Sequence, residues 1–455
     1  MGTICVASQT PLIQFAKNQF EMPDPGTVDV SKLVEGVDYK LSPGGVSRML
    51  YPLLTHMKQS GFIDGSSWIS LNPLAPSRAL FKGMNLNHVV LSPEILKGYG
   101  LIKEDLWYLF HGLQKNRPSL CGFWQDEYID FTFMNRRFSE LAYTLHRQEN
   151  FDGFYIHDFQ LLPMGSMLNI PEPKIFRWHI PFGRMDLPTS WHRFLLHYLE
   201  KYDAVVVSSR RYMEELRNFG YEGPAYHLYP YIDPSNYSHP TSEEVQALRS
   251  RFDIEEDDKV ILTVARMDPL KAQDRAILAV KRVLKEFPKT KLLLVGNGSF
   301  SSSKGGIGLS KADAWRQRLK DCADSLHLAD NVIFAGYMGE KDLCAAYALS
   351  DLFVLPSVRE GFGLVVVEAW LYKKPVIVST SAGIADLIKN GENGLTFDPD
   401  DIEGFASKIT EVLGNRNDFA ELLGENGFKT APLCHIDAGV KKEAEILSNY
   451  LGGAD

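Results

Sequence analysis

Two glutamates flank a glycine turn and an apolar run in the stretch REGFGLVVVEAW, residues 359–370. Glu360 directly precedes the Gly-Phe-Gly turn, and Glu368 follows four hydrophobic residues. Ionised carboxylates only accept hydrogen bonds, so they suit the vicinal hydroxyl groups of sugars. We interpret the pair as ligands of two rings, a sugar on one side of a bound phosphate and a ribose on the other. The alternative is a surface acid at Glu360 and a buried Glu368 satisfied by local donors.

The Gly-Phe-Gly turn lies where a strand is expected to give way to a helix. Residues 351–357 have the apolar composition of a buried strand, and a helix is predicted to begin near Leu364. The backbone amides of Gly363, Leu364 and Val365 would then lack partners within the helix and face the edge of the sheet. Helix N-termini of this kind bind phosphate. The stretch therefore predicts a phosphate site between the two glutamates.

Two cations, Arg266 and Lys271, follow another apolar stretch, residues 259–265, in the sequence VARMDPLK. Ligands of open α/β sheets bind beyond the carboxyl ends of the strands, which is where both side chains are expected. An arginine and a lysine there could hold a diphosphate and stabilise it as it departs. Taken alone, the pair also fits a solvated turn, but the phosphate-binding helix favours the diphosphate.

In the first half of the chain, polar residues follow two predicted strands, 151–158 and 174–182. His157, Asp158 and Gln160 come at the end of the first, and His179 lies near the end of the second. Two such clusters beyond neighbouring strands favour a functional site over isolated structural histidines. The sequence contains no H-E-x-x-H motif and no convincing acidic metal pair, so we expect no metal site.

A glycine pair in SPGGVSRML, residues 42–50, precedes a predicted helix. Gly45 could contact a phosphate or a sugar through its backbone amide. An ordinary turn at a helix start explains the pair equally well. Arg177 and Arg184 flank His179, so an anionic acceptor stays an alternative.

Strands alternate with helices along the chain, which predicts an α/β fold with parallel sheets. A join rich in proline, serine and aromatic residues divides the chain into two doubly wound Rossmann-like domains. We expect an N-terminal domain over 1–235, a C-terminal domain over 236–438, and a last helix in 439–455 that crosses back to the first domain. The Gly/Ser-rich segment 296–308 is interpreted as a mobile loop.

Composition excludes several classes of protein. A chain of 455 residues with 45% hydrophobic and 23% charged residues is typical of a globular protein with more than one domain. A net charge of -9 argues against nucleic acid as a partner. The five cysteines are scattered and show no C-x-x-C spacing, and no run is long enough to span a membrane. We expect a soluble, cytoplasmic protein.

These residues together resemble the signature of retaining nucleotide-sugar glycosyltransferases of the GT-B architecture, in which two Rossmann-like domains face a central cleft. The spacing Glu360-x7-Glu368 and the pair Arg266 and Lys271 match the donor site of glycosyltransferase family 4. HDFQLLP and WHIPF are similar to segments of trehalose-phosphate synthases. The order of motifs over 42–400 is closest to the trehalose glycosyltransferring synthases, although Arg177-Trp178-His179 replaces their Trp-Arg-x-His.

The resemblance implies a role for each matching residue. The residues expected at the catalytic centre are His179, Glu360, Arg266 and Lys271. The residues expected to bind the donor are Gly45, Arg266, Lys271, Gly363, Leu364, Val365 and Glu368. The residues expected to bind the acceptor are Asp158, Gln160 and Arg184. The donor substrate would be a nucleoside-diphosphate sugar, with no cofactor required. The binding partners would be this donor and a small acceptor. We expect the protein to bind neither nucleic acid nor membrane, and a homodimer is one option for its oligomeric state.

The expected reaction moves a hexose, glucose as first choice, from a nucleoside diphosphate to free glucose to give trehalose. A sugar phosphate, glycerate or fructose is the alternative acceptor. Three rivals stay open. One is a phosphorylase that uses inorganic phosphate, one is a sugar-binding protein without turnover, and one is an NAD oxidoreductase. The last rests only on LVGNGSFSS, a weak match to the dinucleotide fingerprint.

Overall fold

The computed structural model describes residues 2–16, 26–42, 45–73, 75–112, 126–183, 187, 189–297 and 307–451. The chain forms two compact units, Met1–Tyr229 with Gly439–Asp455, and Pro230–Ala438. The sequence placed the division between residues 235 and 236, and the structure places it between Tyr229 and Pro230. Arg184 and most of the segment 296–308 lie outside the described residues.

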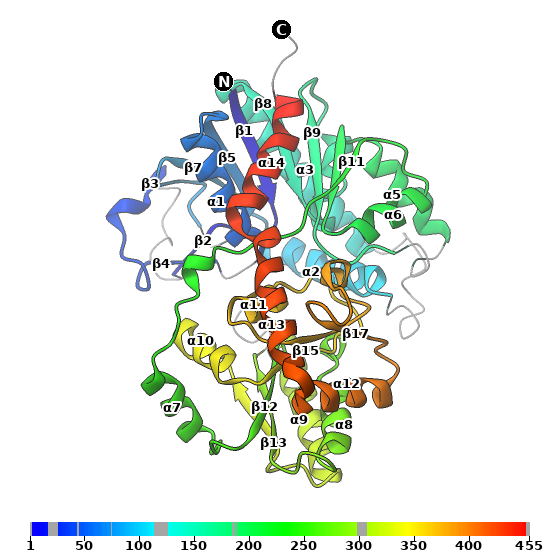
Figure 1. The fold of residues 1–455 in the computed structure, drawn as a ribbon. Coiled ribbons are helices and arrows are strands. Elements are labelled where there is room, and N and C mark those ends of the chain that lie inside the picture. The colour runs from blue at the N-terminus through cyan, green and yellow to red at the C-terminus, as the bar shows by residue number, and fades with distance from the viewer. Residues whose placement is uncertain are drawn as a thin grey trace. The chain divides into compact units, whose positions relative to one another are not determined.

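The first unit is built on a nine-stranded sheet in the order β11-β10-β9-β8-β1-β5-β7-β6-β3 (Figure 1). Its strands are β1 (Gly2–Ser8), β3 (Thr27–Asp29), β5 (Ile63–Leu71), β6 (Arg78–Phe81), β7 (Met84–Val89), β8 (Phe151–His157), β9 (Lys174–Trp178), β10 (Ala204–Val207) and β11 (Ala225–His227). All neighbouring strands are parallel except β6 and β7, and β2 (Ile13–Phe15) pairs antiparallel with β4 (Tyr39–Leu41). Its helices are α1 (Gly45–Gln59), α2 (Pro93–Phe110), α3 (Asp126–Glu149), α4 (Met164–Met167), α5 (Thr189–Leu199), α6 (Arg210–Asn218) and most of α14 (Ile436–Leu451).

Strand alternation assigns the helices of the first unit to two faces of its sheet. Phe154 and Ile156 of β8 belong to a buried apolar cluster with residues of α2, α3, α5 and α6. Tyr155 points to the opposite face, because successive strand residues alternate. There its hydroxyl contacts Glu443 of α14, which runs along this face of the sheet in Figure 1.

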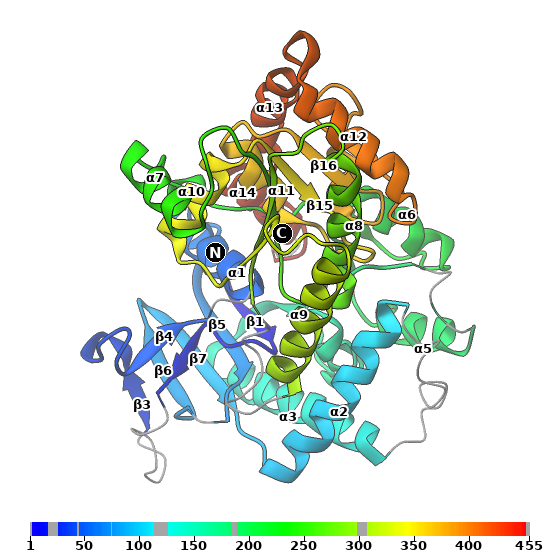
Figure 2. The same ribbon diagram turned by 90° about the horizontal axis from the view of Figure 1, so that it is seen from below.

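The second unit contains a six-stranded parallel sheet in the order β14-β13-β12-β15-β16-β17. The strands are β12 (Lys259–Val264), β13 (Thr290–Val295), β14 (Val332–Gly336), β15 (Leu352–Leu355), β16 (Val376–Ser379) and β17 (Leu395–Phe397). The helices are α7 (Ser242–Arg251), α8 (Gln273–Val283), α9 (Ile307–Ser325), α10 (Glu340–Leu349), α11 (Leu364–Leu371), α12 (Ile402–Gly414) and α13 (Phe419–Thr430). Residues of α8, α9 and α12 pack on one face of the sheet, and Figure 2 shows α8 and α9 beside one another.

In each sheet, successive strands are first added on one side of the starting strand and then on its other side. In the second unit this switch point lies between β12 and β15, and in the first between β1 and β8. Loops at the carboxyl ends of two such strands diverge and leave a crevice that binds ligands. The α/β class predicted from the sequence is confirmed, with one parallel sheet and one sheet that is parallel except for the pair β6 and β7.

Candidate functional site

The crevice of the second unit brings together two of the residues predicted from the sequence. Lys271 lies in the single-turn helix Pro269–Lys271 beyond β12, and Glu360 lies in the loop beyond β15. Lys271 Nζ is 2.6 Å from Glu360 Oε2, and the side chains are 13% and 16% exposed. The backbone N–H of Val358 donates to the Leu270 carbonyl at 2.9 Å, which fastens the two loops to each other. The result is a largely buried ion pair at the edge of the sheet.

Arg266 lies two residues after the end of β12, and its side chain is exposed while its backbone is fixed. Gln273, which is buried, donates from Nε2 to the Arg266 carbonyl at 2.8 Å. Trp315 Nε1 in turn donates to Gln273 Oε1 at 2.9 Å. The loop that carries the two cations is therefore tied to α9, and the guanidinium of Arg266 is accessible to a ligand.

Helix α11 begins as predicted, at Leu364, with Gly363 at its N-cap. Gly363 has φ 107°, a left-handed conformation that favours glycine. A Cβ there would lie 2.8 Å from Leu355 Cδ2 and 3.2 Å from Ile384 Cγ2. Glycine thus lets the chain turn tightly from β15 into α11. The amides of Leu364 and Val365 then begin the helix at the same edge as the ion pair, which suits an anion.

Glu368, in the middle of α11, is held by two tyrosine hydroxyls. Tyr237 donates to Oε1 at 2.8 Å, and Tyr347 donates to Oε2 at 2.7 Å. These are the local donors that the alternative interpretation of Glu368 required. A carboxylate has about four acceptor directions, and these two bonds place one tyrosine on each of its oxygens.

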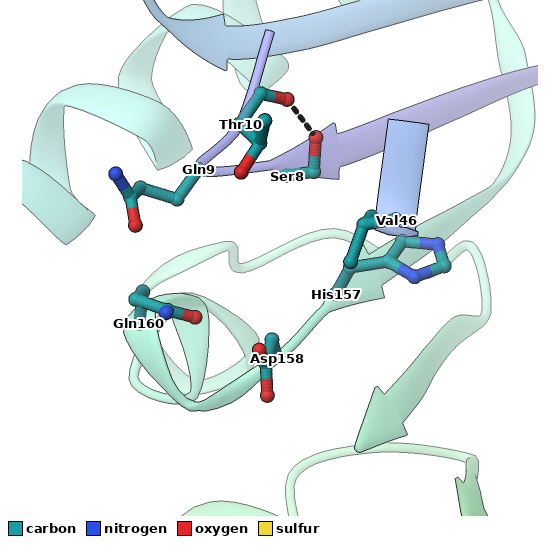
Figure 3. Close-up of a pocket in the computed structure, with 7 residues that line it drawn as sticks. All are labelled: Ser8, Gln9, Thr10, Val46, His157, Asp158 and Gln160. Atoms are coloured by element: carbon teal, nitrogen blue, oxygen red, sulfur yellow. Dashed lines mark hydrogen bonds between the residues drawn. The ribbon is translucent and has the colours of Figure 1, made fainter. Parts of the chain in front are cut away.

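A pocket opens at the crevice of the first unit (Figure 3). It is lined by Ser8, Gln9, Thr10, Val46, His157, Asp158 and Gln160. These residues come from the carboxyl ends of β1 and β8 and from the start of α1. Gly45 is the first residue of α1, next to the lining residue Val46. The pocket therefore contains Asp158 and Gln160, two of the predicted acceptor residues.

His157 and His179 form a pair at the ends of β8 and β9. His157 Nδ1 is 3.0 Å from His179 Nε2, and the two rings stack with centroids 5.3 Å apart. Burial lowers the pKa of His157 well below its usual value, and the neighbouring His179 and Arg177 lower it further. Burial and then Arg177 lower the pKa of His179 as well. Both imidazoles are therefore neutral near pH 7 and able to donate or accept hydrogen bonds.

Asp158 has an unusual backbone conformation and an unusual acidity. Its φ is 68°, which is rare for a residue other than glycine. Burial raises the pKa of Asp158 to about 6, although backbone hydrogen bonds from Phe159 and His179 oppose the rise. This carboxyl group therefore changes charge close to physiological pH.

Arg177 does not reach the pocket. Its side chain is fully buried on the opposite face of β9 from Phe176 and Trp178, and Nη1 pairs with Glu443 Oε1 of α14. Tyr155 donates its hydroxyl to the same carboxylate. The proposal that Arg177 leaves room for an anionic acceptor is therefore wrong, because its side chain is buried and pairs with Glu443 inside the first unit. The acceptor role predicted for Arg184 lies outside the described residues.

Several lining residues were missed by the sequence interpretation. Ser8 ends β1, Gln9 and Thr10 follow it, and none of the three was given a role from the sequence. Their position after a strand at the chain's switch point is a signal that could have found them. Tyr237 and Tyr347 lie 131 and 21 residues from Glu368 in the sequence, and no local pattern connects them to it.

Two searches of the described residues gave no candidates. Among them, no three histidine, cysteine, aspartate or glutamate side chains cluster closely enough to hold a metal ion. None of the helices in the same ranges is long and apolar enough to cross a membrane.

The chain is similar to glycosyltransferases both in sequence and in fold. Residues 244–430 match the family "Glycosyl transferases group 1". A UDP-forming α,α-trehalose-phosphate synthase from Burkholderia xenovorans has the same fold, with a TM-score of 0.74, 17% identity and 99% of each chain covered. HepE of Anabaena in complex with UDP and glucose gives a TM-score of 0.68 at 17% identity, over 99% of this chain and 100% of that one. The GT-B fold expected from the sequence is confirmed.

The relatives of the chain include trehalose synthases and D-inositol 3-phosphate glycosyltransferases. Residues 110–214 match the family "Trehalose synthase, N-terminal domain". The trehalose synthase of Thermococcus litoralis is 29% identical over 278 residues, which are 61% of this chain and 64% of that protein. The chain thus aligns with just under two thirds of the length of this relative. The resemblance to GT-B glycosyltransferases close to trehalose synthase, predicted from the sequence, is confirmed.

Proposed function

We propose that the protein is a retaining hexosyltransferase that moves glucose from a nucleoside-diphosphate glucose to free glucose and forms trehalose. The observation that carries this proposal is the crevice of the second unit, where Lys271 meets Glu360 beside the N-terminus of α11. Cations and helix amides suit a diphosphate, and a carboxylate suits sugar hydroxyls. The similarity to trehalose synthases supports the choice of product.

Departure of the diphosphate is the step that this crevice would favour. Negative charge grows on the bridging oxygen as the bond to the anomeric carbon breaks. Arg266, Lys271 and the amides of Gly363, Leu364 and Val365 would stabilise that charge better than the charge of the bound donor. Glu360 would accept hydrogen bonds from the transferred sugar, and its ion pair with Lys271 orients its carboxylate. Glu368 would bind the ribose.

Retention requires the acceptor hydroxyl to attack on the face that the diphosphate leaves. The departing phosphate oxygen would take the acceptor proton, so no covalent glutamate intermediate is needed. His179 would lie beside the anomeric carbon. In its neutral form it could donate a hydrogen bond to the transferred sugar without adding a positive charge beside an oxocarbenium-like centre.

The pocket of the first unit favours an uncharged acceptor. None of its seven described lining residues is a lysine or an arginine, and Asp158 adds a negative charge above about pH 6. Arg177, the cation closest in sequence to His179, is buried in an ion pair with Glu443 and does not line the pocket. A carboxylate and amides bind sugar hydroxyls, and the carboxylate repels a phosphate group. Free glucose therefore fits better than glucose 6-phosphate or glycerate.

A survey of donors and acceptors tests the proposal. UDP-, ADP-, GDP- and TDP-glucose and GDP-mannose would each be incubated with glucose, glucose 6-phosphate, fructose and glycerate. Released nucleoside diphosphate would be measured, and the linkage of the product would be determined by NMR. We expect an α,α-linked disaccharide from glucose. Release only with another acceptor would contradict the trehalose assignment and keep the transferase. Cleavage of trehalose by phosphate without a nucleotide would show a phosphorylase instead.

A further inference from the structure

Glu368 is fixed by a cluster of three tyrosines that no sequence motif assigns. Tyr237 approaches its Oε1 from the segment that follows residues 234–236, and Tyr347 approaches Oε2 from α10. The two hydroxyls bind different oxygens, at 2.8 and 2.7 Å. The plane of the carboxylate is therefore set by two donors rather than by the rotamer of Glu368 alone.

The tyrosines are themselves held in place. Tyr347 is fully buried, and its ring stacks on Tyr372 with centroids 5.6 Å apart and an interplanar angle of 9°. The Tyr372 hydroxyl donates to the Ser238 carbonyl at 2.9 Å, next to Tyr237 in the chain. Both hydroxyls that reach Glu368 thus belong to one packed group, which links α10, α11 and residues 237–238.

The hydroxyl of Tyr347 is suited to remain a donor. Burial and the adjacent Glu368 carboxylate raise the pKa of Tyr347 well above its usual value. A phenol that stays protonated beside an ionised carboxylate forms a charge-assisted hydrogen bond, which is stronger than a neutral one. Such a bond holds the acceptor in a defined orientation.

We propose that Tyr237 and Tyr347 are positioning residues that orient Glu368 toward the ribose diol of the donor nucleotide. This inference rests on the proposed function, in which Glu368 binds the ribose. A carboxylate turned edge-on can accept from both hydroxyls of a diol, whereas a freely rotating one must be ordered on binding. The tyrosines thereby set the preference of the enzyme for ribonucleotide over deoxyribonucleotide donors.

Nucleotide binding tests this directly. The affinities of the full-length protein for UDP, ADP and GDP and for the 2′-deoxy form of each would be measured by calorimetry. We expect the wild type to bind the preferred ribonucleotide about ten-fold or more tighter than its deoxy form, since hydrogen bonds to charged groups are strong. In Tyr347→Phe, Tyr237→Phe and Glu368→Gln this ratio should fall to roughly one to three.

The ratio separates positioning from general support of the fold. Tyr226→Phe is the matched control, because it removes a phenol that bonds to Tyr450 at 3.0 Å in the first unit, and its ratio should equal that of the wild type. Tyr237 is partly exposed, so Tyr237→Phe provides a folded variant if the buried Tyr347→Phe is unstable.

Each contrary result has its own meaning. Equal losses for both forms of the nucleotide in the two tyrosine variants, with the ratio kept, would overturn the positioning role. A wild type that binds ribo- and deoxyribonucleotides equally would overturn the inference and leave the transferase standing. A wild type that binds none of the diphosphates would overturn the proposed function as well.

Discussion

Arg177 of β9 and Glu443 of α14 form an ion pair inside the first unit, where their side chains are 0% and 1% exposed. Tyr155 joins the pair by donating its hydroxyl to the same carboxylate. The Tyr155 ring also contacts His157 edge-on, with centroids 4.2 Å apart. The C-terminal helix is thus linked through a buried charge network to the histidines beside the pocket.

Removing one partner of this pair should destabilise the protein strongly. Glu443→Ala leaves the Arg177 guanidinium buried without its counter-charge, and such changes cost about 3–5 kcal/mol in the free energy of unfolding. Urea unfolding, followed by a probe in the first unit, would measure the loss. Glu445→Ala on the same helix is the control, because Glu445 is exposed and should change stability by less than about 0.5 kcal/mol. Equal effects of the two substitutions would contradict the importance of the pair.

The raised pKa of Asp158 predicts a pH dependence of activity. If the ionised carboxylate accepts hydrogen bonds from the acceptor sugar, kcat/KM for the acceptor should rise as pH increases through about 6, where Asp158 loses its proton. His157 and His179 should not contribute to this rise, because their lowered pKa values keep them neutral throughout it. Asp158→Asn should lower activity and remove the rise near pH 6. A variant that keeps the same inflection would show that another group titrates there.

The same group should affect stability in the opposite direction. Because the folded pKa of Asp158 lies above its unfolded value, the folded state binds more protons than the unfolded state between about pH 4 and 6. Its contribution to stability is therefore present at low pH and is lost as pH rises through about 6. As pH rises from about 4 to 6, the melting temperature of Asp158→Asn should therefore fall less than that of the wild type. This comparison with the wild type cancels the effect of the histidines.

How far the sequence predicts this molecule differs between its parts. Apolar runs placed two strands of the second unit, expected over 259–265 and 351–357, within a few residues of the observed β12 and β15, because parallel strands are continuous apolar runs. They also placed Arg266, Lys271 and Glu360 beyond strand ends. That Lys271 and Glu360 are in direct contact depends on β15 pairing with β12, which the sequence alone does not specify.

The first unit was harder to predict, and the reasons are physical. Residues 100–150 gave no confident pattern, yet they contribute to α2 and α3, which cover one face of the sheet. The prediction that Arg177 lies near the acceptor was also wrong. Alternation with Phe176 and Trp178 turns the Arg177 side chain to the other face of the sheet. Whether that face meets solvent or a helix depends on α14, whose Glu443 lies 266 residues further along the chain.

Lys271 and Glu360 should both be essential for transfer. Lys271→Ala removes a cation that would stabilise the departing diphosphate, and we expect donor binding and turnover to weaken together, with kcat/KM lower by about 10²–10³. Glu360→Ala should abolish transfer while the circular dichroism spectrum stays unchanged. Lys285→Ala, which removes an exposed lysine just after α8, should retain full activity. Wild-type rates in either Lys271→Ala or Glu360→Ala would refute the role assigned to that residue.

Gly363→Ala should distort the start of α11 and weaken binding of the diphosphate. Alanine at φ 107° is strained by roughly 1–3 kcal/mol, and its Cβ would lie 2.8 Å from the buried Leu355 side chain. The first amides of the helix would then move, so the affinity for the preferred nucleoside diphosphate should fall about ten-fold, given contributions of roughly 1 kcal/mol at helix N-termini. Calorimetry would measure the affinity, and thermal unfolding the strain.

Gly339→Ala is the matched control for this change. Gly339 is also an N-cap, that of α10, but its φ is −69° and a Cβ there would meet no atom within 4 Å. Alanine at that position should therefore leave nucleotide affinity unchanged and lower the melting temperature less than Gly363→Ala. If both substitutions reduce affinity equally, the effect comes from a general loss of stability. If only Gly363→Ala does so, the tight turn from β15 into α11 is what presents the helix amides to the diphosphate.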